Sequence, residues 1–262
     1  MSLKAVYQLL PAFVLVFFRL AGMLLAAPLF GSGRVPKRVK LMFALVFAAG
    51  LLPSIPVPSQ LPDSTWQLTL SILGELLFGL AIGSALSFVF IAVNWAGEII
   101  GQQMGLGLGQ VFDPQFGQSG SVVGDLYFML TLVIFLVIQG HHAFLRGVRD
   151  TFDSLPLFTA TVDQNLLDLV TGLLQSATSM AMQLAAPILV AMLITDVVLG
   201  FLSKTVPQIN VMSAGLSLRA LLGIVVLIVG LALTSDVISQ GIWDSLREIA
   251  QAWQVVPQRV SA

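Results

Sequence analysis

The sequence of 262 residues contains no cysteine and only two histidines, the adjacent pair His141 and His142. Without cysteine the chain has no disulfide, no thiolate nucleophile and no cysteine-based metal site. Two neighbouring histidines without a suitably spaced carboxylate are a poor ligand set for a transition metal, and a solvated loop pair explains them better. We therefore expect no metal, no cofactor and no enzymatic activity.

Charge is also scarce, because Asp, Glu, Lys and Arg together make up 10% of the chain whereas hydrophobic residues make up 57%. A soluble domain carries roughly 25% charged residues, which its water-facing surface requires. The formal net charge of −1 lacks the strongly basic balance of a nucleic-acid binder, so no nucleic-acid partner is expected. The composition predicts an integral membrane protein.

The basic residues that are present gather after the first apolar run, which covers residues 9–30 and is interrupted by Arg19. Four of the twelve lie in one short stretch: Arg34, Lys37, Arg38 and Lys40. Short loops rich in Lys and Arg stay on the cytoplasmic side of a membrane. We therefore expect a cytoplasmic basic loop at this point of the chain.

The next apolar runs predict helices of unequal length. Residues 41–52 form a short run that ends in a proline-rich linker. Ser64 and Gln67 have the spacing of a capping box for a helix over residues 65–98. Such a helix is about 50 Å long, whereas the hydrocarbon core of a bilayer is about 30 Å thick. The helix therefore has to tilt, bend or leave the lipid.

The second half of the chain continues this pattern. An apolar run over residues 122–138 is followed by a more polar segment with both histidines and several charges, which we expect to be a loop. A helical pattern then covers residues 163–204, where Pro187 predicts a kink or a division of the helix. A last apolar run leads into an amphipathic tail with Trp243 and Trp253. The predicted fold is an all-α membrane protein of long, kinked helical hairpins.

Six charged residues lie inside or at the edges of the apolar runs: Arg19, Glu75, Asp125, Asp196, Lys204 and Arg219. A charge at bilayer depth costs about 3 kcal/mol or more unless it is paired or faces protein or water. These residues can form a proton or ion pathway, or they can form salt bridges between helices or between subunits. Their scatter over the chain, with no two of them three or four residues apart, favours the salt bridges.

A glycine-rich stretch over residues 105–120 is the most unusual feature of the chain. Its notable members are Gly105, Gly107, Gly109, Phe112, Asp113, Pro114, Phe116 and Gly117. Alternating glycines disfavour a helix, and an irregular loop between apolar helices has to be buried in protein or line a cavity. The two phenylalanines can close a pore, or they can anchor the loop in a core, and the sequence does not decide between these two roles. By contrast, Gly79 and Gly83 have the spacing of a close helix crossing.

Four segments carry a family resemblance, in the order in which they occur. They are the basic stretch described above, residues 97–106 leading into Asp113-Pro114, residues 139–142, and residues 201–211. Together they resemble the FliR family of flagellar biosynthesis proteins, which belongs to the type III secretion export gates. Gln139 departs from the family's usual Asn, and Lys204 and Val206 replace its usual Arg and Ala. The central segment favours the flagellar branch over the related virulence proteins.

The resemblance implies a subunit of the flagellar export gate in the bacterial inner membrane, at the flagellar basal body. It implies a conical helical pore formed with FliP and FliQ, through which unfolded export substrates pass. It further implies contacts with FlhB, FlhA and the MS ring of the basal body. On this basis residues 1–165 are a FliP-like portion and residues 166–262 a FliQ-like hairpin. Residues 105–120 then correspond to a plug in the pore lumen.

Two other functions can be weighed against the sequence, a transporter and a membrane enzyme. A proton-coupled secondary transporter would use Glu75, Asp125 and Asp196 as a relay. A membrane enzyme is disfavoured, because the sequence offers no recognisable arrangement of nucleophile and base.

Overall fold

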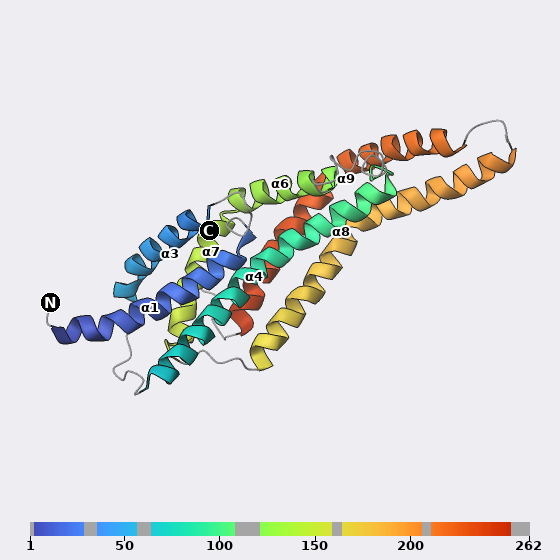
Figure 1. Cartoon of the computed structure of the whole chain (residues 1–262). Coiled ribbons are helices and arrows are strands. Elements are labelled where there is room, and N and C mark those ends of the chain that lie inside the picture. Colours follow the sequence, from blue (N-terminus) through green and yellow to red (C-terminus); the bar gives the residue numbers. More distant parts are fainter. Residues whose placement is uncertain are drawn as a thin grey trace. The chain divides into compact units, whose positions relative to one another are not determined.

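The computed structural model describes residues 3–28, 36–56, 64–107, 121–158, 164–205 and 211–252, and within these ranges every regular element is helical (Figure 1). The elements are α1 (Leu3–Ala26), α3 (Lys37–Leu51), the 3₁₀ helix η1 (Leu52–Ser54), α4 (Thr65–Gln103), α6 (Val122–Val137), α7 (Gly140–Ser154), α8 (Gln164–Thr205) and α9 (Val211–Ala252). The predicted all-α fold is confirmed.

The helices divide between two compact units. Unit 1 comprises Met1–Phe88, Gln139–Leu174 and Trp243–Ala262, and unit 2 comprises Val89–Ile138 and Gln175–Ile242. Three helices, α4, α8 and α9, contribute to both units. Each unit therefore draws on both the proposed FliP-like portion and the proposed FliQ-like hairpin.

The helices have the length and composition of membrane spans. Four stretches qualify singly: Leu9–Ala26, Thr65–Gln103, Leu167–Thr205 and Gly215–Ile249. Helices α6 and α7 pass the same test together, as a broken span or a re-entrant loop. These stretches and the apolar composition identify an all-α membrane protein.

Helix α4 begins and ends at signals that the sequence contains. At its start, the Gln67 amide donates to Oγ of Ser64 at 3.3 Å, which is half of the predicted capping box. At its other end it continues past Glu98 to Gln103. With 39 residues it is about 58 Å long, so it exceeds the thickness of a bilayer by even more than the sequence indicated.

The expectation of a loop after residue 138 is wrong, because residues 140–154 form helix α7. Gln139 takes the left-handed backbone conformation with φ 55° and separates α6 from α7. One side of α7 is buried through Phe144, Val148 and Phe152, four residues apart, and the charges lie on the other side. The segment is polar because it is amphipathic, a property that mean hydropathy alone does not reveal.

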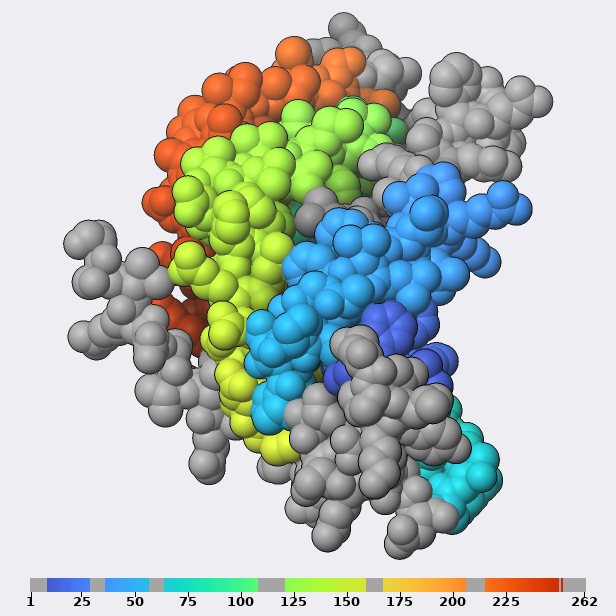
Figure 2. All heavy atoms as spheres, turned by 90° about the vertical axis from the view of Figure 1, so that its left-hand side faces the viewer, coloured from blue at the N-terminus to red at the C-terminus, as the bar shows by residue number. Residues whose placement is uncertain are grey.

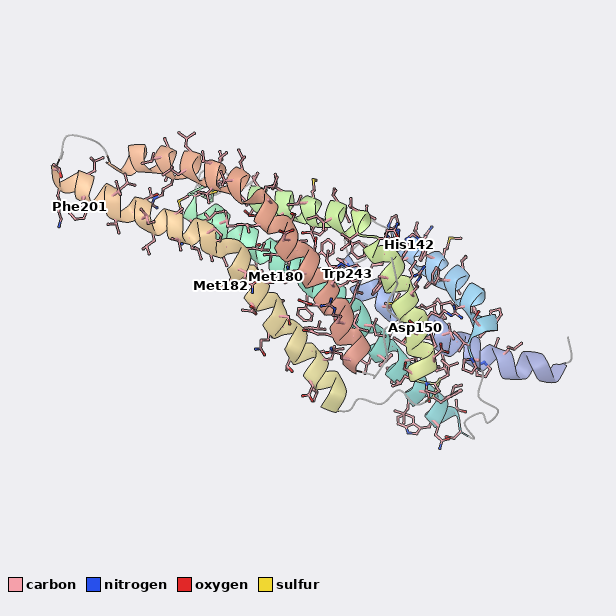
Figure 3. All side chains as sticks on the ribbon, turned by 180° about the vertical axis from the view of Figure 1, so that it is seen from behind. His142, Asp150, Met180, Met182, Phe201 and Trp243 are labelled. Carbon is pink, nitrogen blue, oxygen red and sulfur yellow. The ribbon has the colours of Figure 1, made fainter. Side chains whose placement is uncertain are left out.

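Helix α8 is continuous through Pro187. Proline lacks the amide hydrogen that would bond to the carbonyl of Gln183, four residues earlier. The ribbon of α8 bends close to Met182 (Figure 3), in agreement with the predicted kink. Met180 faces α9, where its Sδ lies 2.6 Å from the position that a Cβ on Gly241 would occupy, and Met182 is exposed.

Candidate functional site

The glycine-rich stretch is the first candidate site, and the structure describes its two ends. Gly105 and Gly107 lie in the turn that follows α4. The other predicted plug residues lie outside the described residues: Gly109, Phe112, Asp113, Pro114, Phe116 and Gly117. The geometry of the ends shows how the stretch is attached to the helices.

Gly105 ends α4 in a Schellman motif. Its φ of +77° is left-handed, a conformation that glycine adopts without steric cost. The Leu106 amide donates to the Gly101 carbonyl at 3.0 Å, and the Gly105 amide donates to the Gln102 carbonyl at 3.0 Å, the two bonds that define this motif. The chain therefore leaves the helix at a fixed point and in a fixed direction.

Ser121 holds the other end of the stretch against α4. As the N-cap of α6, its Oγ accepts from the Gly124 amide at 3.4 Å and donates to the Gly97 carbonyl at 2.9 Å. A Cβ added at Gly97 would overlap the backbone of Gly124, and one at Gly101 would lie 2.5 Å from Oγ of Ser121. Both ends of the glycine-rich stretch are thus tied to the last turns of α4.

Arg19 is the second candidate site, and it is buried at the centre of unit 1, with 1% of its side chain exposed. Its Nε donates to Oε2 of Glu75, which is fully buried on α4. Its Nη1 donates to the carbonyls of Thr151 and Leu155 at 3.2 Å each, and its Nη2 donates to Leu155 at 3.1 Å. These bonds join α1, α4 and the end of α7 through Arg19. The position is favourable because the dipole of a helix attracts a cation to its C-terminus.

Two aromatic rings complete the surroundings of the Arg19 guanidinium. Its Cζ lies 4.3 Å from the centre of the Phe152 ring and 4.9 Å from that of Phe78, within the range of cation–π attraction. The second carboxylate oxygen of Glu75 is buried and has no hydrogen-bond partner among the described residues. The pair is therefore well satisfied on the arginine side and less so on the glutamate side.

The same part of unit 1 contains a close crossing of α1 and α4. A Cβ added at Gly79 would overlap the Arg19 carbonyl oxygen, and one at Gly83 would overlap that of Met23. Gly22 on α1 meets the Leu76 carbonyl in the same way. Small residues of this spacing permit close backbone approach, which is the role that the sequence predicted for Gly79 and Gly83.

The other charges of the apolar runs fall into different settings. Nη2 of Arg219 on α9 lies 2.5 Å from Oδ1 of Asp196 on α8, an ion pair whose side chains are 35% and 42% exposed. Asp125 is exposed in the first turn of α6, where an acid complements the helix dipole. Lys204 is exposed in the last turn of α8.

These settings do not favour a proton relay. Glu75 is paired within unit 1, and Asp196 is paired within unit 2. The described residues include no group of three or more His, Asp or Glu side chains that could hold a metal ion. The rings of His141 and His142 lie 4.2 Å apart between centres, in the first turn of α7 rather than in a loop.

The predicted basic loop is also a helix in its described part. Lys37, Arg38 and Lys40 lie in the first turn of α3, and Arg34 lies outside the described residues. Pro36 is the N-cap of α3. The fixed φ of proline suits the start of a helix, so the helix begins directly in the basic stretch instead of after it.

Comparison with known proteins identifies the family. Residues 10–244 match the model of "Bacterial export proteins, family 1". The chain belongs to this family. It is 30% identical over 230 residues to the flagellar biosynthetic protein FliR of Bacillus subtilis, a match that covers 87% of this chain and 88% of that protein. It is 32% identical over 206 residues to FliR of Escherichia coli, covering 79% and 78%.

The chain is also similar to a protein that carries a different name. The chain is 28% identical over 218 residues to the surface presentation of antigens protein SpaR of Shigella flexneri, covering 82% of each chain. These similarities confirm the resemblance to the FliR family and make the chain a membrane-embedded component of flagellar or type III export.

Sequence reasoning missed two structural elements of this export protein. Phe78 and Phe152 around Arg19 carry no sequence signal, because they are ordinary apolar residues on distant helices. The link between Ser121 and Gly97 had a partial signal, since a serine directly before an apolar run is a common N-cap. Its second bond, to a carbonyl on α4, depends on the close packing of Gly97 on Gly124.

Proposed function

We propose that this chain is one subunit of the flagellar type III export gate and forms, with FliP and FliQ, the pore through which unfolded flagellar proteins are exported. The observation that carries this proposal is the uncovered apolar surface of α9. In the most apolar part of Gly215–Ile249, the stretch of α9 that is long and apolar enough to span a membrane, only 6% of the residues are buried within the chain. An apolar surface of this extent needs lipid or another protein to cover it.

A bilayer alone is too thin to cover the exposed apolar surface of α8 and α9 together. Helices α8 and α9 have 42 residues each, about 63 Å, which is roughly twice the thickness of a hydrocarbon core. Exposed apolar side chains extend along α8 from Leu167 at 61% to Phe201 at 72%, about 51 Å along the helix. On α9 they include Val229 at 77% and Leu233 at 66%. Neighbouring subunits with apolar helices of their own would cover the part outside the bilayer.

In the proposed pore, the two portions of the chain take the places of two different proteins. Residues 1–165 would take a place like that of a FliP subunit, and residues 166–262 a place like that of a FliQ hairpin. The succession of two long helices, α8 and α9, agrees with a hairpin in the second portion. In this arrangement the basal-body MS ring surrounds the gate in the inner membrane, and FlhB and FlhA contact it there.

We further propose that residues 105–120 are the plug of the pore. The attachment of both ends to α4, through Gly105 and Ser121, supports a loop that projects from one point. Phe112 and Phe116 would exclude water and ions from the closed pore, as hydrophobic constrictions do. The glycines would let the loop move aside for a substrate, because glycine accepts many backbone conformations.

The subunit role is tested by purification in a mild detergent. We expect FliP and FliQ to copurify with the wild-type chain. Val229→Glu, which places a charge on the uncovered surface, should abolish this copurification. Asp236→Glu on the same helix is the matched control, since Asp236 is exposed and already charged. A chain that purifies alone in a monodisperse form and transports protons in vesicles would support the transporter instead.

The plug role is tested by ion conductance of the assembled gate. Deleting residues 111–118 should increase conductance while FliP and FliQ still copurify. The double variant Phe112→Ala, Phe116→Ala should have a smaller effect in the same direction, and Ser119→Ala should have none. Unchanged conductance in an intact assembly would show that the loop does not close the pore.

A further inference from the structure

The first quarter of the chain has an unusual charge distribution. No acidic residue precedes Asp63, whereas six of the twelve basic residues do: Lys4, Arg19, Arg34, Lys37, Arg38 and Lys40. Arg19 is neutralised by Glu75. The excess positive charge of the described residues is therefore concentrated in the first turn of α3.

This turn places positive charge where a helix least tolerates it. The N-terminus of a helix carries a partial positive charge, so acidic residues are favoured there and basic ones are not. Helix α3 has no acidic residue in its first turn, and its N-cap Pro36 contributes no side-chain hydrogen bond. Lys37 and Arg38 are exposed. Backbone amides, helix dipole and two exposed cations together suit a phosphate group.

The same helix presents an apolar surface next to the basic turn. Val39, Met42 and Val46 are 50%, 66% and 73% exposed and follow one another at helical spacing. Leu41, Phe43 and Leu45 widen this surface. Only Ala44 and Ala48 are buried within the helix, where α3 packs against α1. Figure 2 shows the outer side of α3 facing the viewer beside α7.

From these two properties we propose that α3 is a binding site for anionic phospholipid. The headgroup phosphate lies against Lys37, Arg38 and the amide end of the helix, and the acyl chains cover Val39, Met42 and Val46. With 15 residues, α3 is about 22 Å long and does not cross a bilayer. A basic end followed directly by an uncovered apolar face fits a lipid better than the acidic, polar surface of a protein.

The experiment measures which lipids remain bound to the full chain, together with the subunits that copurify with it. The protein is reconstituted in nanodiscs with equal amounts of phosphatidylglycerol and phosphatidylcholine, and retained lipids are counted by native mass spectrometry. We expect wild type to prefer phosphatidylglycerol. Lys37→Gln with Arg38→Gln should reduce this preference about thirtyfold, given roughly 1 kcal/mol for each basic residue near an anionic surface.

Four comparisons make the result decisive. Arg149→Gln with Arg247→Gln removes two exposed charges elsewhere and should leave the preference unchanged. Lys37→Arg with Arg38→Lys keeps the charge and should also keep the preference. Val46→Gln should reduce the binding of both lipids. Higher salt should weaken the preference, because ions screen exposed charges.

Several outcomes would overturn the proposal. One is a preference that survives the Lys37→Gln, Arg38→Gln substitution in a protein of unchanged helix content and elution volume. Another is an equal loss in the Arg149→Gln, Arg247→Gln control. Displacement of phosphatidylglycerol by equimolar inorganic phosphate would indicate a site for the free anion. Loss of a copurifying protein with unchanged lipid retention would indicate a protein-binding surface.

Discussion

Replacement of Arg19 by methionine tests whether the buried charges are structural. Methionine keeps much of the apolar volume of the side chain but removes the guanidinium. The substitution leaves the Glu75 carboxylate buried without its partner, and it leaves the Leu155 carbonyl without the bonds from Nη1 and Nη2. It also removes the cation from Phe78 and Phe152.

The expected loss of stability follows from these contacts. Removing one partner of a buried ion pair costs about 3–5 kcal/mol, because the remaining charge is left uncompensated. The double variant Arg19→Met, Glu75→Leu removes both charges, and replacing a whole buried pair by apolar residues is often close to neutral. The unpaired carbonyl at the end of α7 still costs about 1–3 kcal/mol. The double variant should therefore be more stable than Arg19→Met alone.

The assay is reversible unfolding of the purified protein in mixed micelles of increasing denaturing detergent, followed by circular dichroism. Arg247→Met is the control, because its ion pair with Asp244 is exposed, at 67% and 58%, and such pairs contribute less than about 1 kcal/mol. The reasoning is refuted if Arg19→Met is as stable as the control, or if the double variant loses the sum of the two single losses. A relay function would instead appear as proton-dependent transport that Glu75→Gln abolishes without a change in stability.

Three further predictions use the same unfolding assay. Gly79→Ala should cost about 1–3 kcal/mol, since its methyl group overlaps the Arg19 carbonyl, whereas Gly147→Ala, where nothing lies within 4 Å, should gain up to about 1 kcal/mol; equal effects would refute the close crossing of α1 and α4. Gly105→Ala should cost about 1–2 kcal/mol, because φ is +77°, and no loss would argue against the Schellman motif. Ser121→Ala should cost about 1 kcal/mol as a lost N-cap and should raise the basal conductance of the gate; an unchanged conductance would mean that this tie does not hold the plug.

Much of the helical fold could be predicted because its signals are local. The capping oxygen of Ser64 and the kink at Pro187 each act within a few residues of their own position. The spacing of Gly79 and Gly83 is local too, although the crossing that it permits is with the distant helix α1. Their structural effects are therefore visible in the sequence itself. The excess length of the apolar patterns over a bilayer was likewise predictable from residue counts alone.

Two segments that were expected to be loops lie in helices. Residues 140–154 have a low mean hydropathy, yet Phe144, Val148 and Phe152 recur at helical spacing and form a buried stripe. In α7 this spacing places the apolar residues on one side, and the charges lie on the other, exposed side. The charge of the basic stretch around Lys37 predicts a loop, whereas Lys37, Arg38 and Lys40 form the first turn of α3.

The partner of each buried charge could not be predicted, because the pairs join distant positions. Arg19 and Glu75 are 56 residues apart and carry no shared local pattern. Asp196 on α8 and Arg219 on α9 are 23 residues apart and meet only in the folded chain. The sequence indicated that such charges need partners, and the three-dimensional packing determines which partners they have.

The central claim is that FliP or FliQ subunits, in addition to lipid, cover the apolar surface of α9. Its most direct test is a photoreactive amino acid at position 229, where the native valine is 77% exposed, activated in intact cells that assemble flagella. The account predicts covalent products between this chain and FliP or FliQ. Products with phospholipid alone would contradict it.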